Sequence, residues 1–427
     1  MNQKRQVTAW ALWDWGSAAF NAVMVTFVFS AYLASDAFGP DARGTTVLSV
    51  GNAISGLIVA LTAPVVGARA DAGGNRKRQL GLHTVIVVAL IAACFFVRPA
   101  EGYLFLGVAL IALANISFEF AEVSYNSLLL RVSTPATIGR ISGIGWGAGY
   151  LGGIVLLLLV YLGFVSGTQH WFGVSNSDAM NIRVVALFSA VWFAIFALPV
   201  FFALPADEPV SGKAKVSWAQ SYRQLLATLK RLWSNDRNTI KFLIASAVYR
   251  DGLGAVFAYG AILGTQVFGV SPADVIIFAI AANVVAAVGS FIGGWLDDRL
   301  GPLPVIHASL VGMIVVGAVM FFQEGERAFW IYGLALCLFV GPAQSASRAF
   351  LGRLTDARTA GELYGLYATT GRSIAFLTPA LVAMLLLVTK DQRFTIVAIV
   401  VVLVAGIASL LMVKNQTTSK DSEAPVA

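Results

Sequence analysis

The first notable feature of this 427-residue sequence is how little charge it carries. Only 12% of its residues are Asp, Glu, Lys or Arg, whereas a soluble domain has about a quarter. With two cysteines and three scattered histidines, neither a disulfide framework nor a metal site is predicted. The glycine-rich segments lack the Lys-Ser/Thr ending of a phosphate-binding loop. We therefore expect neither an enzyme nor a cofactor.

What fills the sequence instead is apolar. Hydrophobic residues make up 58% of the chain, and the mean hydropathy is +0.78. A helix needs about 20 apolar residues to cross a bilayer, and unbroken runs such as Ile154–Leu162 lack the alternation of a β-barrel. The sequence predicts an all-α integral membrane protein with twelve transmembrane helices, at 8–34, 46–69, 80–98, 103–127, 140–165, 182–204, 239–267, 273–296, 303–323, 328–347, 360–388 and 393–413.

The basic residues are unevenly distributed between the two sides of these spans. With the N-terminus inside, 20 of the 29 lysines and arginines lie on the inner side and 6 on the outer side, while Arg250, Arg348 and Arg372 fall within spans. Inner loops of membrane proteins are enriched in Lys and Arg. We therefore expect both termini in the cytoplasm and a bacterial inner-membrane protein. The net charge of +7 follows this asymmetry, so no nucleic-acid partner is predicted.

A polar segment divides the chain. It separates six predicted spans from six others, and gives an N-terminal bundle at 1–204, a cytoplasmic linker at 205–238, a C-terminal bundle at 239–413 and a cytoplasmic tail at 414–427. Apolar residues recur in the linker at helical spacing, namely Trp218, Tyr222, Leu225, Leu226, Leu229 and Trp233. They predict an amphipathic helix that lies either on the inner leaflet or against the protein's own cytoplasmic face.

The two halves echo each other. The segment Gly67–Arg78, GARADAGGNRKR, matches Gly293–Pro304, GGWLDDRLGPLP, with Asp71 aligned to Asp297. A second echo pairs the segments 125–143 and 347–365, and it aligns Gly139 with Gly361 and Gly143 with Gly365. Internal repeats of this kind are typical of transporters that work by alternating access, with the substrate near the midplane between the halves.

The segment Gly67–Arg78 resembles the loop motif between helices 2 and 3 of the major facilitator superfamily. The stretches WALWDWGSAAFNAVMVTFVF, YRDG, SASRAFLGRLT and GELYGLYATTGRS are similar to the branch that includes the yeast vacuolar amino-acid effluxer of autophagy. The resemblance implies two pseudo-symmetric six-helix bundles. It also implies transport of a small solute, with an amino acid or related zwitterion as the expected substrate.

Ionisable residues inside the predicted spans mark candidate sites, because each costs about 2.5–3.5 kcal/mol to insert. Apart from charges at the span ends, they are Asp14, Glu119, Glu122, Arg250, Asp251, Arg348 and Arg372. In the span 103–127, Asn115, Glu119, Glu122 and Asn126 form one polar stripe at helical spacing. Its glutamates are expected either to bind a substrate ammonium or carry a proton, or to pair with Arg348 and Arg372 across the halves.

Arg372 lies near mid-membrane and is the best candidate to bind a substrate carboxylate, since a guanidinium can grip one bidentately. The alternative is a structural partner for Glu119 or Asp251. Tyr364 and Tyr367 are expected near the same cavity. A gating or charge-relay role is assigned to Asp14, Arg250, Asp251, Arg348, Asp71, Arg76 and Asp297.

Two further expectations concern neighbouring residues. Arg250 and Asp251 are adjacent in the sequence and point about 100° apart on a helix, so one should bond within its half and the other across. Trp13 and Trp15 flank Asp14 and suit an interfacial aromatic belt.

The sequence therefore predicts a secondary transporter of a small zwitterion. Coupling of this transport to protons agrees with the residues, but the sequence does not establish it. Its expected partners are the substrate, protons and membrane lipids, and a monomer is the default state. The alternative is an efflux pump for amphiphilic or cationic drugs. A non-transporting membrane sensor is less favoured.

Overall fold

The computed structural model describes residues 3–40, 42–166, 170–205, 218–356 and 358–414. Within these ranges the protein is built of helices without a β-strand. The first half comprises α1 (Gln3–Ala18), α2 (Phe29–Leu33), α3 (Arg43–Gly73), α4 (Arg76–Ala93), α5 (Leu104–Ser127), α6 (Leu129–Val132), α7 (Ile138–Val160) and α8 (Met180–Ala203). The second comprises α10 (Arg237–Gln266), α11 (Pro272–Leu300), α12 (Pro302–Phe321), α13 (Glu326–Arg353), α14 (Ala360–Ile374), α15 (Leu377–Thr389) and α16 (Phe394–Leu410).

The predicted fold class is confirmed. Each of the twelve predicted spans falls on one of these helical segments, and ten segments are long and apolar enough to cross a membrane. One hydrophobic core lies mainly among α1, α4, α5 and α8, around Trp13, Phe118 and Phe193. A second lies mainly among α10, α12, α13 and α16, around Phe242, Met313 and Phe329. The domain boundaries drawn from the sequence remain a prediction.

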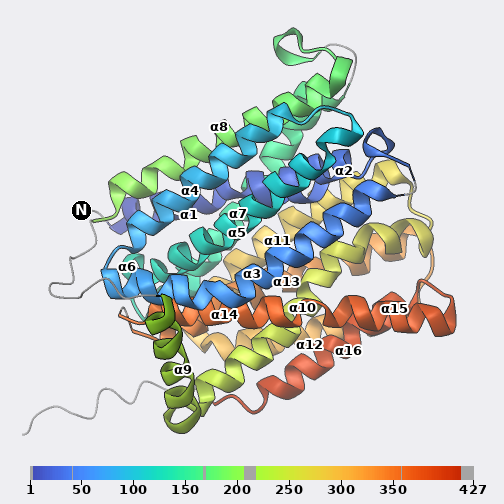
Figure 1. Ribbon diagram of the computed structural model, residues 1–427. Coiled ribbons are helices and arrows are strands. Elements are labelled where there is room, and N and C mark those ends of the chain that lie inside the picture. Colours follow the sequence, from blue (N-terminus) through green and yellow to red (C-terminus); the bar gives the residue numbers. More distant parts are fainter. Residues whose placement is uncertain (1–2, 41, 167–169, 206–217, 357, 415–427) are drawn as a thin grey trace, which may run out of the picture.

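The linker contributes the helix α9 (Trp218–Asn235), which lies across the ends of the bundle helices instead of parallel to them (Figure 1). It packs against α3 of the first half and α10 of the second. We call this end of the molecule, where α1 also begins, the linker end. Linker residues 206–217 and tail residues 415–427 lie outside the described residues.

Two of the long helical segments are interrupted. The first turns from α1 into a π-helix, η1 (Ala19–Phe27), before α2, and π-helical turns are frequent at functional sites. The segment formed by α14 and α15 breaks at Ala375 and Phe376. Interrupted membrane helices expose backbone groups that must find partners, and at the second break the side chain of Asp251 in α10 accepts from Thr378.

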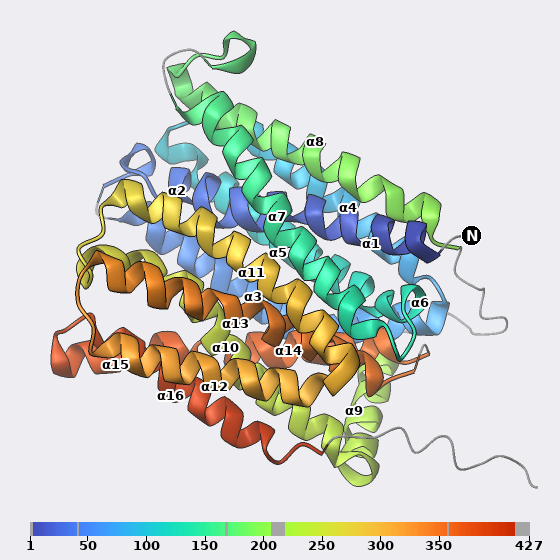
Figure 2. The ribbon, with the colours of Figure 1, turned by 180° about the vertical axis from the view of Figure 1, so that it is seen from behind.

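The halves meet where α7 crosses α11 and α3 crosses α14 (Figure 2). Glycines make both crossings close. A Cβ at Gly143 would strike the carbonyl oxygen of Ser290, and one at Gly365 would lie 2.6 Å from that of Ala63. Gly139 and Gly361 stand one helical turn before these two positions. The two echoed glycine pairs are therefore small-xxx-small faces that let helices of opposite halves touch.

One expectation about aromatic residues is wrong. Trp13 has no exposed surface, so it is not part of an interfacial belt. Its indole Nε1 donates to Thr84 Oγ1 at 3.1 Å, and its ring stacks on Tyr125 with centroids 4.4 Å apart. Because the indole N–H finds a partner inside the first half, the large ring can be used as core.

Gly143→Ala should lower the melting temperature, because its methyl group would collide with the α11 backbone and overpacking costs about 1–3 kcal/mol. Gly56→Ala is the matched control, since a Cβ at Gly56 meets nothing within 4 Å. Alanine is otherwise the better helix former by about 0.5–1 kcal/mol. Tryptophan fluorescence during heating of the purified proteins measures the difference. A Gly143→Ala protein that melts at or above the control would contradict the crossing geometry.

Candidate functional site

The guanidinium of Arg348 joins the two halves. Arg348 belongs to α13 but its side chain ends among helices of the first half, with only 4% of the residue exposed. It donates to Asp14 Oδ2 at 3.3 Å, to Asn126 Oδ1 at 3.2 Å, to Ser142 Oγ at 3.0 Å and to the Ser142 carbonyl at 2.7 Å. These partners come from α1, α5 and α7. One cation therefore holds three helices of the opposite half.

Aromatic rings surround the same guanidinium. The Arg348 Cζ lies 5.0 Å from the ring centroid of Trp10 and 5.5 Å from that of Trp146. Trp10 stacks on Tyr125 with centroids 4.5 Å apart, and the Tyr125 hydroxyl donates to Asp14 Oδ2 at 3.0 Å. Cations are attracted to aromatic faces, most strongly where water is excluded. The predicted gating residues Asp14 and Arg348 thus lie together in one enclosed cluster.

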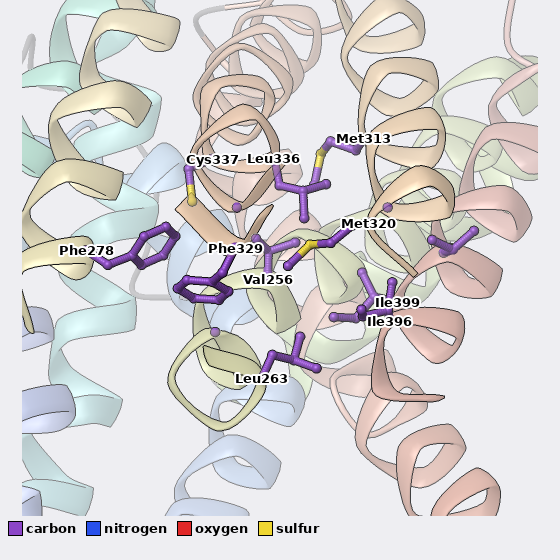
Figure 3. Close-up of a pocket in the computed structure, with 14 residues that line it drawn as sticks. Val256, Leu263, Phe278, Met313, Met320, Phe329, Leu336, Cys337, Ile396 and Ile399 are labelled. Atoms are coloured by element: carbon purple, nitrogen blue, oxygen red, sulfur yellow. The ribbon is translucent and has the colours of Figure 1, made fainter. Parts of the chain in front are cut away.

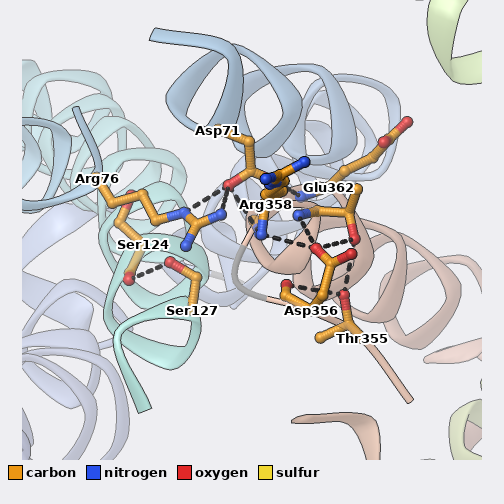
Figure 4. A network of polar contacts seen from close by, with 10 residues as sticks. Asp71, Arg76, Ser124, Ser127, Thr355, Asp356, Arg358 and Glu362 are labelled. Carbon is orange, nitrogen blue, oxygen red and sulfur yellow. Dashed lines mark hydrogen bonds and ion pairs between the residues drawn. The ribbon is translucent and has the colours of Figure 1, made fainter. Parts of the chain in front are cut away.

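A second link is made by Asp71 at the end of α3. Its carboxylate accepts the backbone N–H groups of Gly361 at 3.0 Å and Glu362 at 2.9 Å, in the first turn of α14. Arg76 Nε donates to the same carboxylate at 2.5 Å (Figure 4). Helix N-termini have unsatisfied N–H groups and partial positive charge. Asp71 therefore caps a helix of the other half.

The second half also caps a helix of the first half with an aspartate. The residue that does so is Asp298 and not its neighbour Asp297, which the sequence alignment pairs with Asp71. Asp298 Oδ1 accepts the backbone N–H of Gly139 at 2.8 Å, in the first turn of α7. Asp297 instead forms an ion pair with Arg353 at 2.5 Å. Asp298 is the functional residue that sequence reasoning missed. The adjacent pair of aspartates was the available signal, because either one can reach a neighbouring helix end.

Glu119 and Arg372 form an ion pair across the halves. Glu119 comes from α5 and Arg372 from α14, and both side chains are partly exposed. Glu122, one turn further along α5, makes neither an ion pair nor a hydrogen bond among the described residues. Asn115 Nδ2 donates to Ser55 Oγ at 3.1 Å. The predicted polar stripe thus contacts α3 through Asn115, α14 through Glu119 and α13 through Asn126.

Arg250 and Asp251 both bond within the second half, so the expectation that one would reach across is wrong. The Arg250 guanidinium lies over the Tyr367 ring at 3.8 Å and donates to the Tyr367 carbonyl at 3.3 Å. Asp251 Oδ2 accepts from the backbone N–H of Thr378 at 2.6 Å and from its hydroxyl at 2.5 Å. The break between α14 and α15 creates this new helix start, and Asp251 satisfies it.

Three other predicted site residues lie deeper than the ion pair. Tyr364 is fully buried and its hydroxyl donates to the Arg348 carbonyl at 2.9 Å. Tyr367 supports Arg250, and Asn126 belongs to the Arg348 cluster. Their assignment to substrate binding stays a prediction, while their contacts are with Arg348 and Arg250.

An apolar cavity lies elsewhere, inside the second half (Figure 3). Its lining comes from α10, α11, α12, α13 and α16 and includes Val256, Phe278, Met313, Phe329, Cys337 and Ile399. None of the lining residues is charged. It therefore lies apart from the charged groups between the halves and is not the candidate site.

Arg348→Met should destabilise the protein strongly, because it leaves the Asp14 carboxylate without its guanidinium. Removing one partner of a buried ion pair costs about 3–5 kcal/mol. Asp14→Asn added to Arg348→Met should recover part of this loss. Arg140→Met is the control, since its pair with Asp298 spans 3.6 Å and the Arg140 side chain is 60% exposed, which is worth at most about 1 kcal/mol. Equal melting temperatures for the two arginine variants would refute the central role of Arg348.

The comparisons with known proteins agree with this architecture. The family model described as "Vacuole effluxer Atg22 like" matches residues 36–423. An uncharacterized MFS-type transporter, YxiO of Bacillus subtilis, is 26% identical over 98% of this chain and 97% of its own. Autophagy-related protein 22 of Yarrowia lipolytica is 21% identical over 74% of this chain, and the match covers 57% of that longer protein.

Solved structures give the same fold. The proton:xylose symporter XylE superposes with a TM-score of 0.74 at 12% identity, covering 96% of this chain and 94% of the other. A bacterial homologue of the iron transporter ferroportin, in its outward-facing state, superposes with a TM-score of 0.69 at 14% identity, covering 96% and 99%. At such identities the likeness concerns the fold alone. With the family match over most of its length, the chain belongs to the Atg22-like vacuole effluxer family and is an integral membrane transporter of the major facilitator type.

Proposed function

We propose that the protein moves a small zwitterion, an amino acid or a close relative, across the cytoplasmic membrane by alternating access. The observation that carries this proposal is the Glu119–Arg372 ion pair between α5 of one half and α14 of the other. The two groups have the opposite charges of an α-ammonium and an α-carboxylate. They lie near the middle of their segments, Glu101–Val132 and Ala360–Thr389, where transporters of this architecture hold their substrates.

A zwitterion suits this pair because it exchanges charge for charge. Its carboxylate takes the two-pronged Arg372 guanidinium and its ammonium takes Glu119, so each buried charge keeps a partner throughout binding. A neutral solute would leave the ion pair closed. A simple cation or anion would leave one of the two groups uncompensated.

The distribution of contacts supports the transport cycle. Every cross-half hydrogen bond or ion pair found among the described residues lies at Glu119–Arg372 or on the linker side of it. The halves are thus fastened at the linker end. Since the basic residues favour a cytoplasmic linker, this conformation is the outward-facing one. Release to the other side then requires the contacts of Arg348, Asp71 and Asp298 to separate.

Proton coupling is assigned to Glu122. Away from their ends, the spans contain four carboxylates, Asp14, Glu119, Glu122 and Asp251, against three guanidiniums, Arg250, Arg348 and Arg372. Asp14 and Glu119 have ion-pair partners and Asp251 caps α15. Glu122 has no such partner among the described residues, and Arg250, which itself bonds to Tyr367, acts on it through its charge without forming an ion pair. An ionised carboxylate without a partner is costly inside a protein, so this group has the most to gain from taking up a proton.

The surplus carboxylate also favours a second candidate function, efflux of amphiphilic cations. A lipophilic cation would neutralise Glu122 without disturbing Arg372. The two functions differ in whether a carboxylate on the ligand matters.

The zwitterion proposal predicts a thermal shift. At 100 times its dissociation constant a ligand stabilises its protein by about 2.7 kcal/mol, so a transported amino acid should raise the melting temperature measurably. Arg372→Gln should abolish the shift, because the carboxylate loses its partner. Because that variant also leaves Glu119 unpaired, the neutral pair Glu119→Gln with Arg372→Gln serves as a folding control that must also fail to respond.

Arg393→Gln is the matched control that should keep the shift, since Arg393 binds backbone carbonyls of Phe321 and Gln323 away from the site. The corresponding amine without a carboxylate should give a much smaller shift than the amino acid. A shift given by lipophilic cations alone, and retained by Arg372→Gln, would replace the zwitterion by the cation.

Glu122→Gln should separate proton coupling from substrate movement. In proteoliposomes a pH gradient should drive uptake by the wild type but not by Glu122→Gln, because glutamine cannot exchange a proton. Exchange of labelled for unlabelled substrate should persist in the variant. Glu324→Gln, at a side chain that is 88% exposed, should leave both activities unchanged. Gradient-driven uptake by Glu122→Gln would assign the proton to another group.

A further inference from the structure

The linker helix α9 has two apolar faces, of which one packs against the protein and the other is largely exposed. Ser221 and Leu225 are buried, and Leu232 is partly buried. These three residues, with Thr228, lie within a narrow arc at 100° per residue. The side chain of Thr228 lies beside that of Glu362 of α14, and both line one small cavity. This face attaches α9 to the bundle.

The second face carries an apolar stripe formed by Tyr222, Leu226, Leu229 and Trp233, which follow one another at i, i+4, i+7 and i+11. Leu229, which lies nearest the packed face, is partly buried, and the other three are exposed. Leu226 is 65% exposed and Trp233 is 62% exposed. Exposed apolar residues that stand singly need no explanation, but a continuous stripe along a helix does. We call this set the outer stripe.

The outer stripe continues the lipid-facing surface of α3. The Tyr222 hydroxyl donates to the Leu61 carbonyl at 3.1 Å. Leu61 is 59% exposed and Leu57, one turn away, is 61% exposed, as expected for side chains of a membrane span that face acyl chains. The residue that begins the outer stripe is thus bonded to a helix already immersed in lipid.

Basic residues border the outer stripe on the side away from the bundle. Lys230 and Arg223 are both exposed and follow Leu226 around the helix by about 40° and 60° at 100° per residue. An apolar stripe flanked by Lys and Arg is the arrangement of helices that lie in a membrane interface and attract anionic lipids.

From these observations we propose that α9 lies in the linker-side leaflet, with the outer stripe among the acyl chains and with Arg223 and Lys230 bound to anionic lipid headgroups. The chemical partner is thus a phosphodiester lipid with net negative charge. The contact itself is independent of what the transporter carries.

The position of α9 gives this contact a consequence, which rests on the proposed transport cycle. Tyr222 ties α9 to α3 of the first half, and Thr228 places it beside Glu362 of the second. Glu362 is also one of the two residues whose N–H groups Asp71 holds. Anionic lipid that fixes α9 should therefore stabilise the conformation fastened at the linker end.

The first test compares a fluorescent label on the outer stripe of α9 with one that lies outside the stripe. Leu226→Cys and Ala227→Cys are each made in a full-length protein whose two buried cysteines, Cys94 and Cys337, are replaced by alanine. Both positions are exposed, but they point about 100° apart. In lipid nanodiscs with brominated acyl chains, an NBD label at 226 should be quenched while one at 227 keeps its intensity. Equal intensities at the two positions would overturn the membrane contact.

The second test asks whether anionic lipid stabilises the helix start that Asp71 caps. Amide hydrogen exchange is followed in the peptide that contains Gly361 and Glu362, in phosphatidylcholine nanodiscs with and without phosphatidylglycerol. The anionic lipid should slow exchange in the wild type. Since each basic residue at an anionic surface is worth about fivefold in binding, Arg223→Gln with Lys230→Gln should remove most of the effect.

Arg5→Gln with Arg299→Gln is the matched control, because it removes two exposed charges outside α9 and should keep the response. Unchanged exchange on adding phosphatidylglycerol to the wild type would overturn the coupling, even where the label at 226 is quenched. Neither measurement uses the substrate, so their outcome is separate from that of the zwitterion proposal.

Discussion

The burial of one guanidinium constrains the rest of this structure. Arg348 extends from the second half into the first, and a charge so enclosed must find partners at every donor. It finds oxygen acceptors on α1, α5 and α7. Three aromatic rings lie around the rest of the guanidinium. The conformation fastened at the linker end is therefore determined by the polar contacts of Arg348 as well as by the packing of the helices. To open that end, the guanidinium must exchange all these contacts for water or for other groups.

The two aspartate caps follow the same logic in a weaker form. Asp71 closes the first turn of α14, and Asp298 closes the first turn of α7, so each half supplies a charge to a helix start of the other. A carboxylate near a helix N-terminus is worth about 0.3–1 kcal/mol at exposed sites and up to about 2 when partly buried. Such increments are large enough to bias two conformations and small enough to be broken in each cycle. Glycines at both helix starts let the carboxylates approach, since a Cβ at Gly139 would lie 2.7 Å from Asp298.

The sequence predicted the parts of this design that depend on composition and spacing. The twelve spans, the helical linker and the echoed glycines needed only apolar run lengths and small-residue periodicity. Partner choice was less predictable. Adjacent aspartates at 297 and 298 are equivalent in the sequence, and only the docking of α7 decides which one meets a helix start. Trp13 was misplaced because a tryptophan beside an aspartate suits an interface as well as a core. The helix start that Asp251 caps was overlooked although Pro379, in the first turn of α15, was the available signal, since a proline has no N–H to bond the carbonyl of Ala375 and suits a helix start.

The candidate site and the fastening contacts are parts of one interface, and this relation gives the proposed cycle its physical basis. Glu119 and Arg372 form the innermost of the cross-half polar links, and Tyr364 donates to the Arg348 carbonyl. A ligand that pairs with both Glu119 and Arg372 breaks the direct ion pair between them. It then links the two halves through its own two ion pairs. Its effect on the conformational equilibrium is therefore set by the difference between those ties, since a ligand shifts an equilibrium only by its differential affinity for the two states. A substrate with both charges can hold the halves together at mid-membrane while the linker end separates, which a ligand with one charge cannot do through this pair.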